Sequence, residues 1–203
     1  MVAEELLGVG HKIEFKLFAL FDKVMAFCTS NTSTLYGFIY DQIIVAGELA
    51  STTIVSEYLN AEGLQNQWLD ARELIRTDNH YTDAKIDWVK TEELISTNPI
   101  IAENNLIITQ GFIGATSERN STTLGREGSD FSVFIFANVL NAEKLTIWKD
   151  VQGVYNSDPN QNDEAVFIEK LSYREATEMT YYGAKVIHPK TIKPLQNAGI
   201  PLY

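Results

Sequence analysis

The chain has 203 residues, of which 45% are hydrophobic and 21% charged, a composition typical of a folded globular protein and not of a disordered one. Its 16 basic and 27 acidic side chains give a formal net charge of −11, which argues against nucleic acid as a partner and requires a local basic cluster for any anionic ligand. Cys28 is the single cysteine, which excludes an intramolecular disulfide, and the apolar run at 24–27 before it predicts a buried packing role.

The N-terminus and the apolar runs argue against secretion and membrane insertion. Glu4 and Glu5 stand where a secretory signal carries basic residues. The longest uncharged apolar run, residues 131–140, is shorter than the ~20 residues of a membrane-spanning helix. We therefore expect a cytoplasmic protein without a membrane partner.

The first third of the chain is expected to be helical. Its first apolar side chains recur at helical spacing, at Leu17, Leu20, Phe21, Val24 and Phe27. Residues 35–60 predict two further apolar helical segments, interrupted at Gly47. Residues 67–69, Gln-Trp-Leu, then predict a brief buried strand.

The remainder alternates between predicted strands and helices. Residues 106–109 predict a strand covered on both faces, Asp130 to about Asn141 a helix, and residues 145–148 another strand. Ser172 and Glu175 form a capping-box pattern, and the helix that it starts is expected to run towards Tyr182 and to stop at Gly183. A short helix is predicted after Pro189 and a strand from Ile200 to Tyr203.

This alternation predicts an α/β fold, a three-layer sandwich with a mainly parallel central sheet between helices. We expect one domain over 1–203, with a mainly helical portion at 1–65 and an α/β portion at 66–203. Ligands of such folds bind beyond the carboxyl ends of the strands, where the polar stretches after Thr109 and Trp148 fall. Because the chain opens on a helical segment and ends within a strand, the pattern predicts a domain cut at both ends.

The stretch Thr122–Asp130, Thr-Thr-Leu-Gly-Arg-Glu-Gly-Ser-Asp, lies between a predicted strand and a predicted helix. Its glycines allow a ligand to approach the backbone, and the helix N-terminus favours an anion. Arg126 could bind a carboxylate through two hydrogen bonds. An ordinary capped loop explains the same residues, and the stretch alone does not decide between the two.

Three further segments allow a functional and a structural interpretation. The polar residues 148–160 could hold a nucleotide or form a plain surface loop with a turn at Asp158. Lys185 could bind a phosphate or could interact favourably with the negative end of a helix dipole. His188 alone does not make a metal site. Glu48 could face a ligand ammonium group or sit solvated at a helix start.

The order of these motifs resembles the aspartate kinase branch of the amino acid kinase family. The matching segments are Gly47–Ser51, Gln110–Gly114, Thr122–Asp130, Trp148–Val154, Asp158-Pro159 and Gly183–Pro189. Together they cover the chain from about residue 14 onward. The resemblance implies ATP-dependent phosphorylation of the L-aspartate side-chain carboxylate to 4-phospho-L-aspartate, the first step towards lysine, threonine and methionine.

The resemblance also implies residue roles. Glu48 matches the glutamate that holds the substrate ammonium group, and Arg126 matches the arginine that binds the substrate carboxylate, with Glu127, Gly128 and Ser129 completing that loop. Asp130 matches the aspartate that organises phosphate-binding lysines. The positions matching nucleotide contacts are Lys149, Asp150, Tyr155, Asn160, Lys185 and Val186. Of these, Lys185 would counter charge on the transferred phosphate.

The resemblance implies ATP as co-substrate, Mg²⁺ carried largely by ATP without a protein metal site, and a homo-oligomer in the full-length parent. Position 160 is Asn where many relatives carry Arg or Lys. A Lys-Phe-Gly-Gly-Thr-Ser segment, expected before Glu48, and the C-terminal regulatory domains have no counterpart here. We therefore expect a partial catalytic domain with little turnover. The open alternatives are a glutamate or carbamate kinase, or a non-catalytic domain that binds nucleotide or amino acid.

Overall fold

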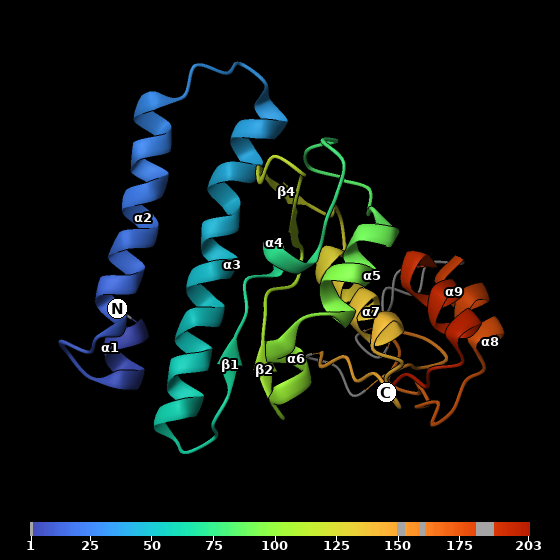
Figure 1. The fold of residues 1–203 in the computed structure, drawn as a ribbon. Coiled ribbons are helices and arrows are strands. Elements are labelled where there is room, and N and C mark those ends of the chain that lie inside the picture. The colour runs from blue at the N-terminus through green and yellow to red at the C-terminus, as the bar shows by residue number, and fades with distance from the viewer. Residues whose placement is uncertain (1, 150–152, 159–160, 182–188) are drawn as a thin grey trace. The chain divides into compact units, whose positions relative to one another are not determined.

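The computed structural model of the chain describes residues 2–149, 153–158, 161–181 and 189–203 (Figure 1). The chain divides into two compact units, Met1–Ser132 and Val133–Tyr203. The helices within the described residues are α1 (Val2–Leu7), α2 (Ile13–Ser30), α3 (Tyr36–Ala61), α4 (Ala71–Leu74), α5 (Trp88–Ser96), α6 (Pro99–Glu103), α7 (Gly128–Val139), α8 (Tyr173–Tyr181) and α9 (Pro189–Ala198). The strands are β1 (Gln67–Trp68), β2 (Ile107–Ile108), β3 (Ile113–Ala115) and β4 (Ser121–Thr123).

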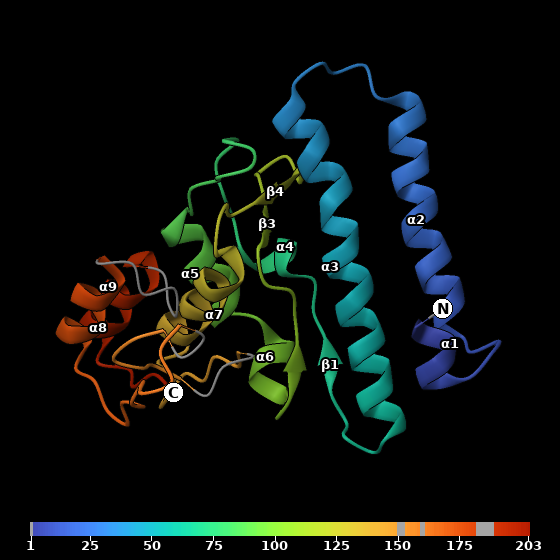
Figure 2. The same cartoon turned by 180° about the vertical axis from the view of Figure 1, so that it is seen from behind.

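In the first unit α2 and α3 run side by side as two long antiparallel helices (Figures 1 and 2). Their shared core also takes in α1 and consists of Ala3, Ile13, Leu17 and Ala50, with Leu7, Leu20 and Ile54 packed against it. The helical prediction for the first third of the chain is therefore confirmed.

The predicted interruption at Gly47 is wrong, because α3 continues through it. A glycine inside a helix costs only about 1 kcal/mol relative to alanine. Burial of Val45, Ala46 and Leu49 on either side of Gly47 outweighs that cost. Glu48 consequently lies in the middle of a long helix and not at a helix start.

The predicted burial of Cys28 is also wrong, because its side chain is exposed. Phe27 packs edge-on against Phe38 of α3, with ring centroids 5.7 Å apart. One residue further along an α-helix is rotated by about 100°, which turns Cys28 away from that contact. Met25, in the same apolar run, is exposed as well.

Two short strand pairs follow the long helices. β1 and β2 lie where strands are predicted and pair in parallel, in the register Gln67↔Ile107 and Trp68↔Ile108. The predicted burial of the first strand is wrong, since Gln67 is exposed and Trp68 half-buried. The side chains of Ile107 and Ile108 are half-buried, however, and not covered on both faces as expected. β3 and β4 form an antiparallel hairpin whose residues are all buried.

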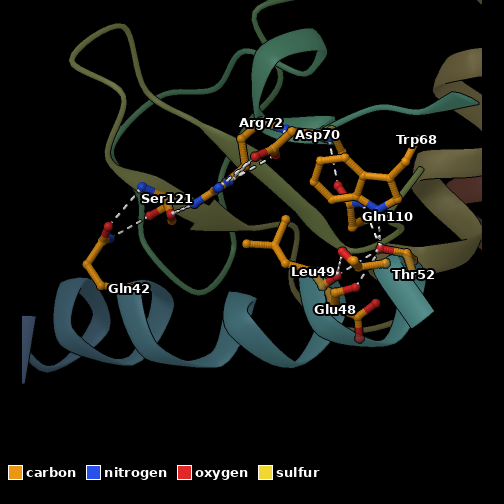
Figure 3. Close-up of polar contacts among 11 residues, drawn as sticks. Gln42, Glu48, Leu49, Thr52, Trp68, Asp70, Arg72, Gln110 and Ser121 are labelled. Carbon is orange, nitrogen blue, oxygen red and sulfur yellow. Dashed lines mark hydrogen bonds and ion pairs between the residues drawn. The ribbon is translucent and has the colours of Figure 1, made fainter. Parts of the chain in front are cut away.

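α3 passes over both strand pairs and contacts β1, β2 and β4 (Figure 1). By length and composition alone α3 could cross a membrane, a property that buried helices of water-soluble proteins share. Its polar side chains instead bind the neighbouring strands. The amide of Gln42, for example, accepts from the main-chain N–H of Ser121 at 3.0 Å and donates to the carbonyl of Ser121 at 2.8 Å (Figure 3).

In the second unit α8 and α9 lie where helices are predicted. The strands predicted at 145–148 and 200–203 are reduced to a single parallel bridge between Leu145 and Leu202. The capping box that opens α8 is formed, since the Glu175 carboxylate accepts from the hydroxyl and the main-chain N–H of Ser172. α9 begins at Pro189 as predicted, whereas the expected stop at Gly183 lies outside the described residues.

Candidate functional site

Glu48 presents a half-buried carboxylate from the middle of α3 (Figure 3). Partial burial raises its pKa above the ordinary value, because desolvation disfavours the charged form. Within the described part of the chain, this carboxylate forms no hydrogen bond or ion pair. A ligand ammonium group would supply the missing positive charge and lower the pKa again.

The helical turn that begins at Glu48 is fixed to the strand ends by a polar cluster (Figure 3). The hydroxyl of Thr52 donates to the carbonyl of Glu48 at 2.8 Å. It accepts hydrogen bonds from the indole N–H of Trp68 at 3.0 Å and from the amide of Gln110 at 2.8 Å. Trp68 ends β1, and Gln110 follows β2 by two residues, so this turn lies at the carboxyl ends of the parallel pair.

A close backbone contact joins the motif that starts at Gln110 to the start of α7. A Cβ atom on Gly111 would lie 3.0 Å from Cα and Cβ of Ser129, so only glycine fits without displacing α7. The next residue, Phe112, has φ +70°, and its N–H donates to the Ser132 hydroxyl at 2.9 Å. These contacts bring the motifs at 110–114 and 122–130 together.

The loop between β4 and α7 carries the predicted substrate residues. Arg126 and Glu127 are exposed, and Arg126 forms no hydrogen bond or ion pair with another described residue. Glu127 has φ +57°, a left-handed conformation that residues other than glycine adopt mainly under local constraint. Gly128 and Ser129 open α7, where main-chain N–H groups favour an anion.

Asp130 lies in the first turn of α7 and is 8% exposed. Residues 122–130 do connect a strand to a helix, but that strand, β4, belongs to a hairpin that the sequence did not predict, and α7 begins at Gly128, two residues before the predicted start at Asp130. The start of α7 combines N–H groups, a nearby arginine and a buried carboxylate. The N–H groups and the arginine can orient an anionic ligand against the helix terminus, whereas the Asp130 carboxylate would repel an anion and favour a cationic group instead.

Sequence analysis did not identify Asp41, a fully buried carboxylate on α3. It accepts hydrogen bonds from the N–H of Thr82 at 2.9 Å and from the N–H and the hydroxyl of Thr123 at 3.0 and 2.8 Å. Thr82 has φ +72°, which is unusual for a β-branched residue. The adjoining Asp83 approaches Gly125, whose Cβ position lies 2.5 Å from an Asp83 carboxylate oxygen. Asp41 therefore helps to position the loop between β4 and α7, which carries Arg126.

Asp70 and Arg72 were also not identified from the sequence. The Asp70 carboxylate caps α4 by accepting the Arg72 N–H at 3.0 Å, and it accepts the Arg72 guanidinium at 2.6 Å (Figure 3). The same guanidinium donates to the Ser121 hydroxyl at 3.1 Å. This arrangement connects the end of β1 to β4. Because Arg72 is paired in this way, we assign it a structural role.

In the second unit the nucleotide predictions are described in part. Lys149 is exposed, and the ring of Tyr155 packs edge-on against Phe167 at 5.7 Å. The N–H of Gln161 donates to the carbonyl of Asp158 at 3.0 Å, whereas the other two residues of the predicted turn, 159 and 160, lie outside the described residues. The other predicted nucleotide positions lie outside the described residues: Asp150, Asn160, Lys185 and Val186.

No group of three or more His, Cys, Asp or Glu side chains that could hold a metal ion occurs within the residues that the structure describes. Mg²⁺ carried by ATP therefore stays a prediction.

The amino acid kinase family model matches residues 4–203. The chain belongs to this family. Lysine-sensitive aspartokinase 3 of Escherichia coli is 38% identical over 164 residues, which is 80% of this chain and 36% of that protein. A bifunctional aspartokinase/homoserine dehydrogenase of Arabidopsis thaliana is 40% identical over 159 residues, 77% of this chain and 17% of that protein.

The solved structures agree with the sequence relatives. E. coli aspartokinase III in complex with aspartate and ADP matches with a TM-score of 0.88 at 34% identity, covering 98% of this chain and 45% of that one. Clostridium acetobutylicum aspartate kinase matches with a TM-score of 0.75 at 27% identity, covering 98% and 40%. The predicted α/β amino acid kinase fold and the resemblance to aspartokinases are thus confirmed. The chain spans about a third, or less, of the length of these two curated relatives.

Proposed function

We propose that this chain carries the substrate and nucleotide site of an aspartate kinase, which transfers the γ-phosphoryl group of ATP to the side-chain carboxylate of L-aspartate. The products are 4-phospho-L-aspartate and ADP. Support comes from relatives that are aspartokinases and from the structural similarity to one that binds aspartate and ADP. Membership of the amino acid kinase family does not by itself specify the phosphoryl acceptor, and the acceptor that we propose is L-aspartate.

One observation carries the choice of an amino acid as acceptor. The first unit contains two opposite charges, on Glu48 and Arg126, that pair with no other described residue. An amino acid has an ammonium group and a carboxylate, and binding both at once fixes its orientation. Glu48 is proposed to take the ammonium group. Arg126 takes the α-carboxylate, with Glu127, Gly128 and Ser129 completing the loop.

Phosphoryl transfer needs a positioned nucleophile and countercharge for the phosphate. In the proposed reaction an oxygen of the aspartate side-chain carboxylate attacks the γ-phosphorus, and ADP leaves with the electron pair of the broken P–O bond. Asp130 is proposed to organise the cationic groups around the phosphates, and Lys185 to neutralise the charge that develops on the transferred group. The nucleotide positions are Lys149, Asp150, Tyr155, Asn160, Lys185 and Val186.

ATP is the proposed co-substrate, and ADP in a neighbouring structure supports that choice. Mg²⁺, bound mainly by the ATP phosphates, would supply the remaining countercharge. The proposed setting is the cytoplasmic route to lysine, threonine and methionine, in a homo-oligomer. The plant relatives are chloroplastic, so relatives of this chain work in more than one compartment.

An acceptor panel tests the proposal. Single-turnover mixtures with the chain in excess over radiolabelled ATP detect even slow transfer, and hydroxylamine traps an acyl phosphate as a stable hydroxamate. We expect hydroxamate with L-aspartate and none with UMP, and much less with L-glutamate or carbamate. Glu48→Gln should abolish the aspartate signal while ATP binding persists. Equal product with L-glutamate, or product from UMP alone, would replace the proposed acceptor.

A further inference from the structure

Thr52 has a hydroxyl group whose hydrogen-bonding capacity is fully used. Its single proton points to the carbonyl of Glu48 at 2.8 Å, and its two lone pairs accept from Trp68 and Gln110 at 3.0 and 2.8 Å (Figure 3). A hydroxyl on an exposed helix face would instead exchange its partners with water. Thr52 therefore fixes the turn that carries Glu48 against the ends of β1 and β2.

Gln110 extends this cluster in the other direction. It is 1% exposed, and its side-chain oxygen accepts the N–H of Ala71 at 2.8 Å. The next residue, Gly111, packs on Ser129 so tightly that an added Cβ atom would lie 3.0 Å from Cα and Cβ of Ser129. A continuous series of contacts thus runs from Glu48 through Thr52 and Gln110 to the start of α7.

We propose that Thr52 and Gln110 are positioning residues, which hold Glu48 at the correct distance from the Arg126 loop and thereby determine the affinity for the amino acid substrate. This inference rests on the proposed function, because it assumes that Glu48 binds the substrate ammonium group. Neither residue is proposed to touch the reacting atoms. Both act by fixing the positions of Glu48 and of the N-terminus of α7.

The geometry separates this role from general stabilisation of the helix. Thr53, the next residue of α3, is equally half-buried, and its hydroxyl donates to the carbonyl of Leu49 at 2.6 Å within the same helix. Thr53 thus makes a local helix contact only, whereas Thr52 connects the helix to two strand ends. The same substitution at the two positions removes the same atoms from the same helix, so Thr53→Val is a matched control.

The test compares variants of the full chain by calorimetric titration with L-aspartate and, separately, with ADP. Thr52→Val keeps the side-chain shape, and the loss of about one net hydrogen bond at the turn should weaken L-aspartate binding by about tenfold. ADP binding should stay unchanged. Thr52→Ser retains the hydroxyl and should bind L-aspartate within about twofold of the wild type.

Gln110→Met removes the hydrogen bond between Gln110 and Thr52 while Thr52 itself is unchanged. This variant therefore provides a second test of the positioning role if Thr52→Val folds poorly. Because the two residues share one hydrogen bond, the loss of affinity in the double variant should be smaller than the two single losses combined. A shift of the Trp68 indole N–H resonance in Thr52→Val, absent in Thr53→Val, would report directly that the contact has been lost.

The outcomes separate the two proposals. If the wild type and Thr52→Val bind L-aspartate equally, the positioning role is wrong and the proposed function stands. If Thr53→Val weakens L-aspartate binding as much as Thr52→Val, or if ADP binding falls in parallel, the role is merely structural. If the folded wild type does not bind L-aspartate while it binds another amino acid, the proposed function fails and the inference about aspartate fails with it.

Discussion

The carboxylate of Asp41 and the main-chain N–H of Thr123 lie 3.0 Å apart although 82 residues separate them in the sequence. The same carboxylate accepts the Thr123 hydroxyl and the N–H of Thr82. Three donors around one buried carboxylate satisfy its charge without a basic partner. The contact joins the longest helix to the strand that leads into the Arg126 loop.

Asp41→Asn should therefore destabilise the fold. Both main-chain N–H groups donate to one carboxylate oxygen and the Thr123 hydroxyl faces the other, so Asn can keep these contacts with its amide nitrogen donating to that hydroxyl. It nevertheless replaces three charge-assisted hydrogen bonds by weaker neutral ones, at a cost of about 1–3 kcal/mol. Urea unfolding followed by circular dichroism measures this change. The same substitution at the exposed Asp22 of α2 is the control and should have little effect. Equal, small effects at both positions would contradict the structural role of Asp41.

Glu48→Gln should stabilise the protein at neutral pH while it weakens L-aspartate binding. Burial raises the pKa of Glu48, so the folded state holds this proton more tightly than the unfolded chain does. The contribution of Glu48 to stability therefore falls as pH rises from the unfolded-state pKa to the raised folded-state pKa, and stays low above it. Because Gln carries no charge, the stability of the Glu48→Gln variant does not show this fall with rising pH.

Melting temperatures at several pH values measure the Glu48 effect. The advantage of Glu48→Gln should be present at pH 7 and should fade below the ordinary carboxyl pKa of about 4.3. Glu92→Gln, at an exposed position in the middle of α5 and away from both helix ends, serves as the control. The same advantage at pH 7 and at low pH would show that desolvation of the charge is not its cause.

Gly125→Ala should distort the Arg126 loop. Gly125 has φ +76°, and an added Cβ would lie 2.5 Å from an Asp83 carboxylate oxygen, so both backbone strain and a steric clash arise. We expect lower stability and weaker L-aspartate binding. Gly47→Ala is the matched control, because nothing lies within 4 Å of its Cβ position inside α3, and it should stabilise by about 0.5–1 kcal/mol. Equal responses would contradict the assigned geometry.

Asp130→Ala distinguishes a proposed catalytic organiser from a helix cap. If Asp130 arranges cationic groups around the phosphates, the single-turnover transfer rate should fall with little change in the L-aspartate Kd, because that role matters most in the transition state. Loss of a cap alone would lower stability by about 1 kcal/mol and leave the rate intact. A lower melting temperature with an unchanged rate would therefore exclude the proposed role.

Local signals were sufficient for several elements. The Ser172–Glu175 capping box, Pro189 at the start of α9 and the loop before α7 depend on residues close together in sequence, and each is found where predicted. The ordered motifs also sufficed to predict the family. The prediction at Gly47 was wrong because its neighbours Val45, Ala46 and Leu49 are buried against elements from other parts of the chain, which local sequence does not show.

The polar clusters could not be predicted from local patterns. Asp41 bonds to a residue 82 positions away and Gln110 to one 58 positions away, and sequence periodicity contains no information about such pairs. Cys28 shows the same limit, since its apolar neighbours suggested burial whereas its position on α2 leaves it exposed. Tertiary contacts decide which polar side chains are buried and which apolar ones are not.

Calorimetric titration of the chain with L-aspartate in the presence of ADP tests the central claim most directly. We predict saturable binding of L-aspartate, at least tenfold weaker binding of L-glutamate, and loss of the L-aspartate signal in Glu48→Gln and in Arg126→Ala. ADP binding should persist in both variants, which establishes that they are folded. Binding of L-aspartate that is unaffected by both substitutions, or no binding by a chain that still binds ADP, would contradict an L-aspartate site built from Glu48 and Arg126.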